Sequence, residues 1–126
     1  MANAFLTYVV GTKLFGCAKC KATLTSVEHR VSTHFIGETG PAWLFDRVDN
    51  VTCEPRADRM LKTGRHFTTT VRCRRCREYL GWKYEYAFDE TEIYKEGMTV
   101  LERSKIRELA DTVDDKPSAG KRIASL

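Results

Sequence analysis

The sequence has no long run of apolar residues. None of its runs of hydrophobic side chains exceeds five residues, whereas a transmembrane helix needs about 20. The apolar stretch from Phe5 to Val10 has no Lys or Arg before it, and Lys13 soon ends it, which is the wrong order for a secretion signal. We therefore expect no membrane partner, and a location in the nucleus, in the cytoplasm or in both.

Residue patterns typical of catalysis are also missing. The sequence contains no Ser/His/Asp order, no phosphate-binding glycine loop and no pair of carboxylates spaced for acid–base catalysis. Its five cysteines are an odd number, which fits poorly with the disulfide framework of a secreted protein. In a reducing compartment, paired cysteines indicate metal binding or redox chemistry instead.

What is present suits one folded domain. The chain has 126 residues, of which 42% are hydrophobic and 30% are charged, and this balance excludes a wholly disordered protein. Thirteen aromatic residues are enough to fill a core. The length of the chain leaves no room for two independent cores.

The charge of the chain changes sign along the sequence. The net charge is +4, but residues 56–77 hold eight basic side chains against Asp58 alone, whereas residues 78–102 carry a net charge of −5. A protein that lies along nucleic acid usually keeps one sign over a broad face. Nucleic-acid binding is therefore kept as an alternative function. The basic side chains that would carry it are Arg72, Arg74, Arg75 and Arg77.

Short strands are expected through most of the chain. From about residue 5 to residue 106, Thr, Val, Tyr, Trp and Phe are frequent, and turn residues interrupt them at short intervals. We predict strands at residues 42–51, 65–71 and 79–88, and hence a mainly β fold. Alternation in the last strand predicts one buried aromatic face. That face would consist of Leu80, Trp82, Tyr84, Tyr86 and Phe88.

The residue pattern changes towards the end of the chain. Ile106, Leu109, Ala110 and Val113 have helical spacing, which predicts a short helix, although a continued strand fits nearly as well. The residues that follow are small and polar with few apolar anchors. We therefore expect a flexible tail at residues 111–126.

Two pairs of cysteines give the strongest signal in the sequence. Each pair has two residues between its members, a spacing that lets both sulfur atoms of one tight turn bind the same ion. Two such turns complete a tetrahedral shell, for which zinc is the best candidate and an iron–sulfur centre the main competitor. Four thiolates leave no open position for water, so we expect one structural Zn²⁺ that joins distant parts of the domain. The predicted ligands are Cys17, Cys20, Cys73 and Cys76.

Four short motifs accompany the cysteine pairs. They are Gly40-Pro-Ala-Trp-Leu-Phe45, Leu61-Lys-Thr-Gly-Arg-His66, Leu80-Gly-Trp-Lys-Tyr-Glu85 and Tyr94-Lys-Glu-Gly97. Together with the C-x2-C-x52-C-x2-C spacing, these motifs closely resemble the Yippee family of small eukaryotic zinc proteins. The resemblance implies an N-terminal segment at residues 1–12 and a Yippee-type zinc-binding domain at residues 13–110.

The resemblance also implies a fold. Yippee domains look like members of the β-tent class, in which two antiparallel sheets meet at a zinc ion held by two cysteine turns. Related folds include the thalidomide-binding domain of cereblon, the Mis18 proteins and the B-type methionine sulfoxide reductases. We therefore expect two antiparallel sheets clamped by one zinc site.

The likeness to cereblon implies a ligand pocket. In that domain three tryptophans form a cage for a cyclic imide, and Trp82 matches one of them, but the places of the other two fall near Lys62 and at Thr68. The resemblance implies instead a remodelled pocket for a methylated cation or an apolar side chain. Taken singly, its aromatic members are also typical core residues. The predicted pocket residues are Trp43, His66, Phe67, Trp82 and Tyr84.

The likeness to the reductases implies an enzymatic alternative. Sulfoxide reduction needs a nucleophilic thiolate downstream of the second zinc turn, but no cysteine follows Cys76. The remaining thiol, Cys53, lies beside Glu54 and before Pro55, a setting without the basic neighbours of a reactive cysteine. A methionine sulfoxide reductase-like enzyme is therefore the weaker alternative.

The favoured hypothesis is a non-enzymatic, zinc-stabilised domain that binds a protein partner through an aromatic face around Trp82. The family resemblance implies a role in growth or cell-cycle control. It also implies, for some members, association with subunits of the GID/CTLH ubiquitin ligase. These expectations follow from kinship and not from particular residues of this chain.

Overall fold

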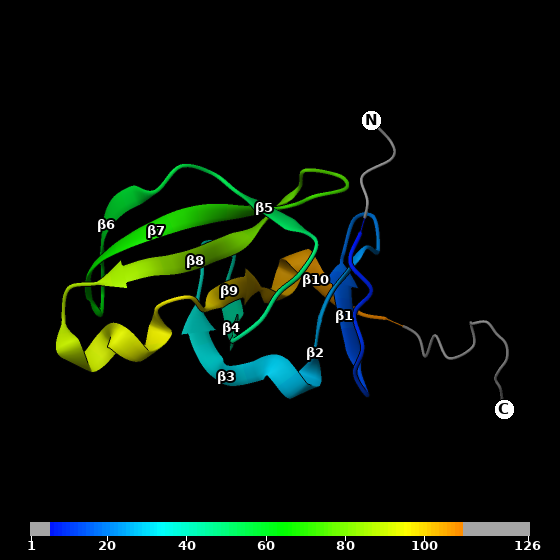
Figure 1. Cartoon of the computed structure of the whole chain (residues 1–126), viewed down its shortest axis with the longest axis horizontal. Helices are drawn as coiled ribbons and strands as arrows, with labels where there is room; N and C mark the ends of the chain where they lie inside the picture. Colours follow the sequence, from blue (N-terminus) through cyan, green and yellow to red (C-terminus); the bar gives the residue numbers. More distant parts are fainter. Residues whose placement is uncertain (1–5, 110–126) are drawn as a thin grey trace, which may run out of the picture.

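The computed structural model describes residues 6–109, which fold mainly into β-strands (Figure 1), so the predicted fold class is confirmed. The first strands are β1 (Leu14–Cys17), β2 (Thr23–Ser26), β3 (Arg30–Ile36), β4 (Pro41–Phe45), β5 (Val51–Cys53) and β6 (Ala57–Leu61). They are followed by β7 (Gly64–Cys73), β8 (Tyr79–Ala87), β9 (Thr99–Glu102) and β10 (Ile106–Glu108). Short 3₁₀ helices lie between some strands: η1 (Val27–His29), η2 (Glu90–Lys95) and η3 (Arg103–Lys105).

The strands of the described residues form two antiparallel sheets, as the family resemblance implied. The small sheet has the strand order β10-β1-β2. The large sheet has the order β3-β4-β9-β8-β7-β5, and β6 pairs with β7 outside this path. In Figure 1 the long β7–β8 pair crosses the upper part of the molecule, and the small sheet lies on the right. No helix of residues 6–109 has the length and apolar character that crossing a membrane requires.

The core fills the space between the two sheets. Phe15 and Leu24 of the small sheet pack with Phe45 and Leu101 of the large sheet. Neighbouring residues of β4 and β9 alternate between this core and a second apolar cluster, which therefore lies on the opposite face of the large sheet. The second cluster consists of Ala42, Leu44, Trp82, Tyr84 and Val100. The central strands of the large sheet are thus buried on both faces.

Two β-bulges interrupt the pairing of β7 with β8. The pairing skips Leu80 at one bulge and Glu85 at the other. Each extra residue changes the side of the sheet that the next side chains face. Leu80 therefore packs between the two sheets, whereas Trp82 and Tyr84 belong to the second cluster on the opposite face.

Beyond the second bulge the aromatic side chains at the end of β8 and just after it are exposed. Tyr86 is 47% and Phe88 43% exposed, and both rings pack with Phe67 of β7 at centroid distances of 5.9 Å and 5.1 Å. We call Phe67, Tyr86 and Phe88 the outer aromatic cluster. The prediction of one continuous buried face along residues 79–88 is therefore wrong, because alternation assumes a strand without bulges.

The predicted strand limits are partly confirmed. Residues 65–71 lie within β7, as expected. The strand predicted at residues 42–51 ends at Phe45, and the chain resumes a strand only at β5. The loop between them ends at Asn50, whose φ of 63° lies in the left-handed region and cannot continue a strand.

The helix predicted after residue 105 is wrong, and its strand alternative is confirmed. Ile106 begins β10, which pairs with β1, and its side chain is buried in the core between the sheets. The backbone hydrogen bonds to β1 satisfy groups that a short helix would leave open at both ends. The other residues of the predicted helix, Ala110 and Val113, lie outside the described residues, as does the predicted tail at residues 111–126.

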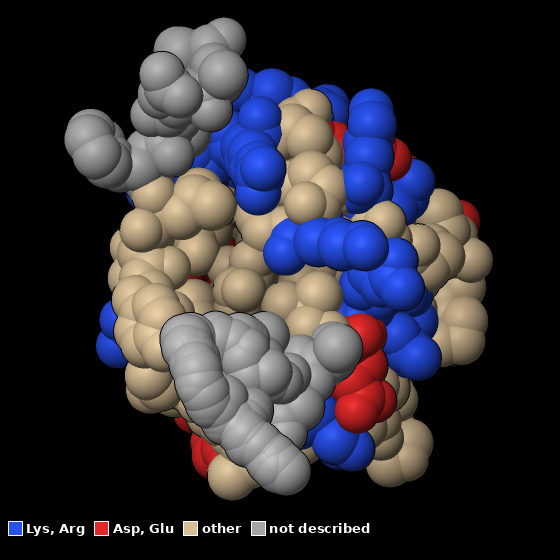
Figure 2. Space-filling model, turned by 90° about the vertical axis from the view of Figure 1, so that its right-hand side faces the viewer, with Lys and Arg blue, Asp and Glu red and all other residues tan. Residues whose placement is uncertain are grey.

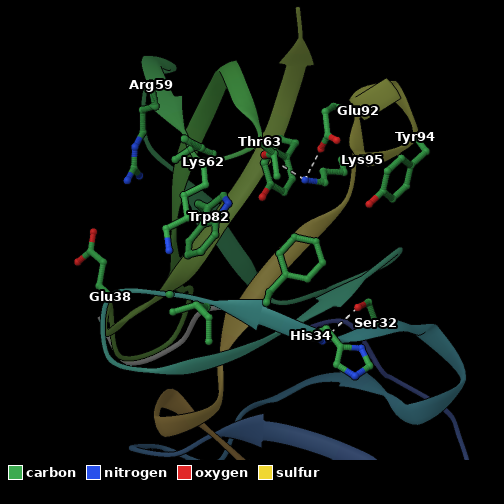
Figure 3. Close-up of a pocket in the computed structure, with 15 residues that line it drawn as sticks. Ser32, His34, Glu38, Arg59, Lys62, Thr63, Trp82, Glu92, Tyr94 and Lys95 are labelled. Atoms are coloured by element: carbon green, nitrogen blue, oxygen red, sulfur yellow. Dashed lines mark hydrogen bonds and ion pairs between the residues drawn. The ribbon is translucent and has the colours of Figure 1, made fainter. Parts of the chain in front are cut away.

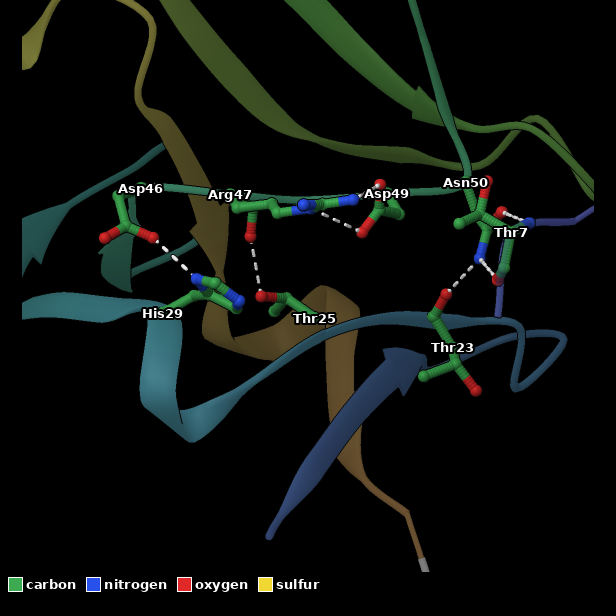
Figure 4. Close-up of polar contacts among 8 residues, drawn as sticks. All are labelled: Thr7, Thr23, Thr25, His29, Asp46, Arg47, Asp49 and Asn50. Atoms are coloured by element: carbon green, nitrogen blue, oxygen red, sulfur yellow. Dashed lines mark hydrogen bonds and ion pairs between the residues drawn. The ribbon is translucent and has the colours of Figure 1, made fainter. Parts of the chain in front are cut away.

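Asn50 joins three parts of the chain (Figure 4). Its side-chain Nδ2 donates to the carbonyl oxygens of Thr7 and Thr23 at 2.9 Å and 2.6 Å, and its Oδ1 accepts from the Thr7 backbone N–H. Its own carbonyl oxygen accepts from the backbone N–H of Arg74 at 2.9 Å. One buried residue thus links the N-terminal segment, the small sheet and the turn between β7 and β8.

Other contacts of the same loop reach β2 and η1. Thr25 Oγ1 donates to the carbonyl oxygen of Arg47 at 2.7 Å, and His29 Nδ1 lies 2.8 Å from the Asp46 carboxylate. His29 is therefore a packing residue near the surface, and the loop is fixed along much of its length.

We expect Asn50→Ala to destabilise the domain by about 3 kcal/mol, because it removes buried hydrogen bonds and places a Cβ-bearing residue without local side-chain bonding at a left-handed φ. Asn50→Gly removes the same hydrogen bonds but tolerates this φ, so it should cost about 1 kcal/mol less. Urea unfolding followed by circular dichroism measures both variants. Native-like stability of Asn50→Ala would show that this junction does not hold the sheets together.

Candidate metal centre and ligand cavity

Two similar turns bring the four predicted ligands together. In the first turn, after β1, the Cys17 N–H donates to Ala22 O and the Lys21 N–H donates to Cys17 O, at 2.9 Å and 2.8 Å. The second turn, after β7, repeats this pattern at the same distances, from Cys73 to Glu78 and from Arg77 to Cys73. The residue after each second cysteine has a left-handed backbone, with φ of 68° at Lys21 and 69° at Arg77. The hydrogen bonds of each turn hold it closed in spite of that strain.

The sulfur atoms of Cys17, Cys20, Cys73 and Cys76 lie within 4.8 Å of one another. Across the two turns, the sulfur atoms of Cys17 and Cys76 are 3.5 Å apart, as are those of Cys20 and Cys73. None of the four forms a disulfide. A tetrahedral zinc ion with Zn–S bonds of about 2.3 Å places its sulfur ligands about 3.8 Å apart. The four thiols therefore fit a zinc ion in both chemistry and spacing.

A positive ion resolves an electrostatic conflict at this cluster. Burial raises the pKa of the Cys17 thiol to about 12, and burial also raises the pKa of Cys20. The thiols must nevertheless be deprotonated to act as ligands. A bound divalent cation favours the thiolate form, so metal binding and ionisation of the cluster are coupled.

Basic side chains surround the cluster, but acidic neighbours pair with several of them. Arg72 forms an ion pair with Glu54, and both Lys19 and Lys105 pair with Glu78. The basic run in the sequence is therefore partly neutralised within the fold.

A cavity of about 700 Å³ lies beside the second apolar cluster (Figure 3). Its walls come from four elements, which contribute Phe35 of β3, Leu61 of β6, Trp82 and Tyr84 of β8, and Lys95 of η2. The volume is within the range of about 300–1,000 Å³ that small-ligand pockets have. The cavity is therefore large enough for a side chain of a partner or a small molecule.

Trp82 and Tyr84 are the two predicted pocket residues that line this cavity. The Trp82 side chain is 8% exposed, and its indole Nε1 has no hydrogen-bond partner. Burial raises the pKa of Tyr84. The nearby Trp82 indole lowers the pKa of the Tyr84 hydroxyl and so offsets part of this effect of burial. The two groups nevertheless do not meet the geometry of a hydrogen bond.

The other three predicted residues lie elsewhere, so the five do not form one pocket. His66 is fully buried behind Tyr84, at a centroid distance of 5.1 Å, and its Nδ1 lies 2.9 Å from the carbonyl oxygen of Gly64. Phe67 belongs to the outer aromatic cluster. Trp43 packs edge-on against Phe15 at 5.4 Å, at the junction of the two sheets. Adjacent residues of β7 face opposite sides of the sheet, which separates His66 from Phe67.

Several cavity residues escaped the sequence analysis. Phe35 and Lys95 line the cavity, although neither was predicted as a site residue. Lys95 stands in the Tyr94-Lys-Glu-Gly97 motif, and that position was the available signal. Cys53, the thiol outside the metal cluster, is exposed on β5.

Glu102 holds the β3–β4 turn beside the cavity. Its buried carboxylate accepts hydrogen bonds from the backbone N–H groups of Glu38 and Thr39, at 2.9 Å and 2.7 Å, and from the Tyr79 hydroxyl at 2.6 Å. Burial alone would raise the pKa of Glu102, but these bonds outweigh it and lower the pKa. The turn that carries Glu38 at the cavity rim is therefore fixed by a buried, ionised carboxylate.

Comparison with known protein families gives one match over most of the chain. A family model described as "Yippee zinc-binding/DNA-binding /Mis18, centromere assembly" matches residues 13–118. Protein yippee of Drosophila melanogaster is 44% identical over 108 residues, which cover 86% of this chain and 89% of that protein. Human protein yippee-like 3 is 42% identical over 88 residues, or 70% of this chain and 74% of that protein.

A solved structure has the same fold. The crystal structure of the Mis18 "Yippee-like" domain aligns with a TM-score of 0.63, covering 79% of this chain and 96% of that domain. The two sequences are 16% identical, so this likeness concerns the fold alone.

Proposed function

Because the chain belongs to the Yippee-Mis18 family, we propose that it is a non-enzymatic protein-interaction domain stabilised by one zinc ion. The single observation that carries the interaction role is the cavity lined by Trp82 and Tyr84. The four cysteines lie apart from it, at the core between the two sheets. The cysteines supply all the ligands that a structural zinc ion needs, and the cavity supplies a shaped, largely apolar surface for a partner.

The proposed zinc ion has a structural role because four thiolates fill its coordination shell. No position is left for a water molecule or a substrate, so the ion cannot activate a nucleophile. The first pair of ligands follows β1 of the small sheet, and the second pair follows β7 of the large sheet. One ion therefore fixes the two sheets relative to each other, and with them the strands that line the cavity.

Membership of the family supports a proposal about the location, role and partners of the protein. We propose a location in the nucleus, the cytoplasm or both, and a role in growth or cell-cycle control with subunits of a GID/CTLH-type ubiquitin ligase among the partners. Affinity purification from a eukaryotic cell identifies such subunits directly by mass spectrometry.

Trp82→Ala should strongly reduce the recovery of protein partners from a cell extract. A buried tryptophan at the centre of an interface contributes about 2 kcal/mol or more to binding, so affinity should fall about 30-fold. Quantitative mass spectrometry of the captured proteins measures the change. Phe88→Ala is a matched control, because it also removes an aromatic ring but changes the outer aromatic cluster instead of the cavity.

Near-ultraviolet circular dichroism must first show that Trp82→Ala is folded, because Trp82 also belongs to the second apolar cluster. Trp82→Phe retains much of the packing and serves where the alanine variant is unfolded. Equal recovery of the same proteins by the wild type and by a folded Trp82 variant would contradict the proposed role of the cavity.

Nucleic-acid binding is the second candidate function, and one surface favours it. Figure 2 shows the side of the molecule that carries the small sheet, where Lys and Arg side chains predominate over acidic ones. Arg75 and Arg77 of the second cysteine turn are exposed. The description of the family also names DNA binding. Phosphate contacts release counterions, so this function requires a steep fall of affinity with salt.

A titration of the protein with duplex and single-stranded DNA at several salt concentrations separates the two functions. Under the favoured proposal, the protein binds DNA weakly, and Arg75→Glu does not change the recovery of protein partners.

A sulfoxide reductase finds little support, because Cys53 is exposed on β5 and is not among the residues that line the cavity. Turnover of methionine sulfoxide that survives Cys53→Ser would revive the enzymatic alternative.

A further inference from the structure

An ammonium group already lies among the aromatic rings of the cavity (Figure 3). Nζ of Lys95 is 5.1 Å from the ring centre of Phe35, 5.2 Å from that of Tyr84 and 5.9 Å from that of Tyr94. These separations are typical of cation–π contacts. The Lys95 side chain is 3% exposed and forms an ion pair with Glu92. The chain's own lysine thus takes the place that a methylated cation would need.

The indole N–H of Trp82, in the cavity wall, is a hydrogen-bond donor without a partner of good geometry among the described residues. Nε1 of Trp82 is buried, and the nearby Tyr84 hydroxyl does not meet the geometry of a hydrogen bond with it. A buried N–H without an acceptor is unfavourable, so a guest that brings an oxygen atom to it gains more than a guest that brings another donor. An acceptor therefore suits this wall better than a cation.

The rim of the cavity adds two positive charges. Lys62 is exposed and Arg59 is half-buried, and neither forms an ion pair within residues 6–109. Figure 3 shows Arg59, Lys62 and Glu38 on the same side of the opening, with Glu38 on the connection between β3 and β4. Glu92 lies deeper and is neutralised by Lys95. The unpaired charge around the opening is therefore positive on balance.

We propose that the cavity binds an acidic segment of a partner protein. An apolar or aromatic side chain of the segment packs on Trp82 and Phe35, an oxygen accepts from Trp82 Nε1, and neighbouring carboxylates face Lys62 and Arg59. A peptide fits better than nucleic acid, since two rim cations are few for a path along phosphates and Glu38 shares the rim. This inference rests on the proposed function and names the chemistry of its partner.

Selection from a random peptide library displayed on phage, with the zinc-loaded full chain as bait, tests the inference. We expect the peptides that require Trp82 to be enriched in Asp and Glu beside Trp, Phe or Leu. Lys62→Glu should weaken a selected peptide about tenfold, because repulsion replaces attraction at the rim. Arg107→Glu makes the same charge change at an exposed position of β10 and should leave affinity within about twofold.

Three other outcomes of these experiments would each overturn part of the account. Selected peptides that require Trp82 but are basic or neutral, or that bind more tightly to Lys62→Glu, would overturn the acidic segment while the proposed function stands. A thymidine oligonucleotide that displaces the peptides and loses affinity with Lys62→Glu would assign the cavity to nucleic acid instead. If neither the selected peptides nor the proteins captured from cells depend on Trp82, the proposed function fails as well.

Discussion

The variant Cys73→Ser will bind no zinc tightly and will not fold cooperatively. Cys73 is fully buried, and its sulfur atom lies 3.5 Å from that of Cys20 across the two turns. Structural zinc sites can contribute about 10 kcal/mol or more of apparent binding free energy to the folded state. Because the total stability of a domain is only about 5–15 kcal/mol, losing one ligand removes most of the folding free energy.

Cys53→Ser is the matched control for this prediction. It makes the same replacement of sulfur by oxygen at an exposed position outside the metal cluster, so its melting temperature should stay close to that of the wild type. Thermal unfolding followed by circular dichroism, together with the zinc content of each purified variant, measures the difference. A Cys73→Ser protein that melts cooperatively at the wild-type temperature would remove the structural role of the ion.

Gly81→Ala should destabilise the domain by at least about 3 kcal/mol. Gly81 lies in the middle of β8 and pairs with Leu101 of β9. A Cβ atom at this position would be 1.9 Å from the carbonyl oxygen of Val100. Since that oxygen belongs to the backbone of a buried strand, no side chain can move aside. The two strands would have to separate at the residue next to Trp82, so the cavity wall should be disturbed as well.

Gly97→Ala tests the same substitution without a clash. Gly97 has a φ of +84°, and nothing lies within 4 Å of the position of its Cβ. It should cost about 1–2 kcal/mol, through backbone strain alone. Urea unfolding of the two variants compares them directly. A Gly81→Ala protein no less stable than Gly97→Ala would mean that β8 and β9 do not approach each other as closely as described.

The metal ligands were predictable from the sequence because the information is local. The spacing of Cys17 with Cys20, and of Cys73 with Cys76, forces two sulfur atoms into each turn. That the two turns meet was an inference from the number of ligands that an ion needs. The left-handed residues at Lys21 and Arg77 were not foreseen, because neither is a glycine.

The cavity was predictable only in part. Trp82 and Tyr84 were found through the family resemblance, and their shared face follows from alternation along β8. The face does not extend beyond Tyr84, because a bulge at Glu85 turns the following aromatic rings outward. A bulge depends on how two strands pair, and no residue pattern within one strand reveals it.

The remaining cavity residues come from segments that are distant in the sequence. Phe35 lies on β3 and Lys95 on η2, and the folded sheet brings them to the same opening. Nζ of Lys95 lies among three rings, in the place that the predicted methylated cation would need. Only the assembled fold could reveal this, since a lysine next to a tyrosine in a sequence normally lies at the surface.

X-ray absorption at the zinc edge, with the metal content of the purified native protein, tests the central claim most directly. We predict one zinc ion per chain, surrounded by four sulfur atoms at about 2.3 Å. A folded protein that contains no zinc, or a zinc ion with nitrogen or oxygen among its nearest ligands, would contradict the account.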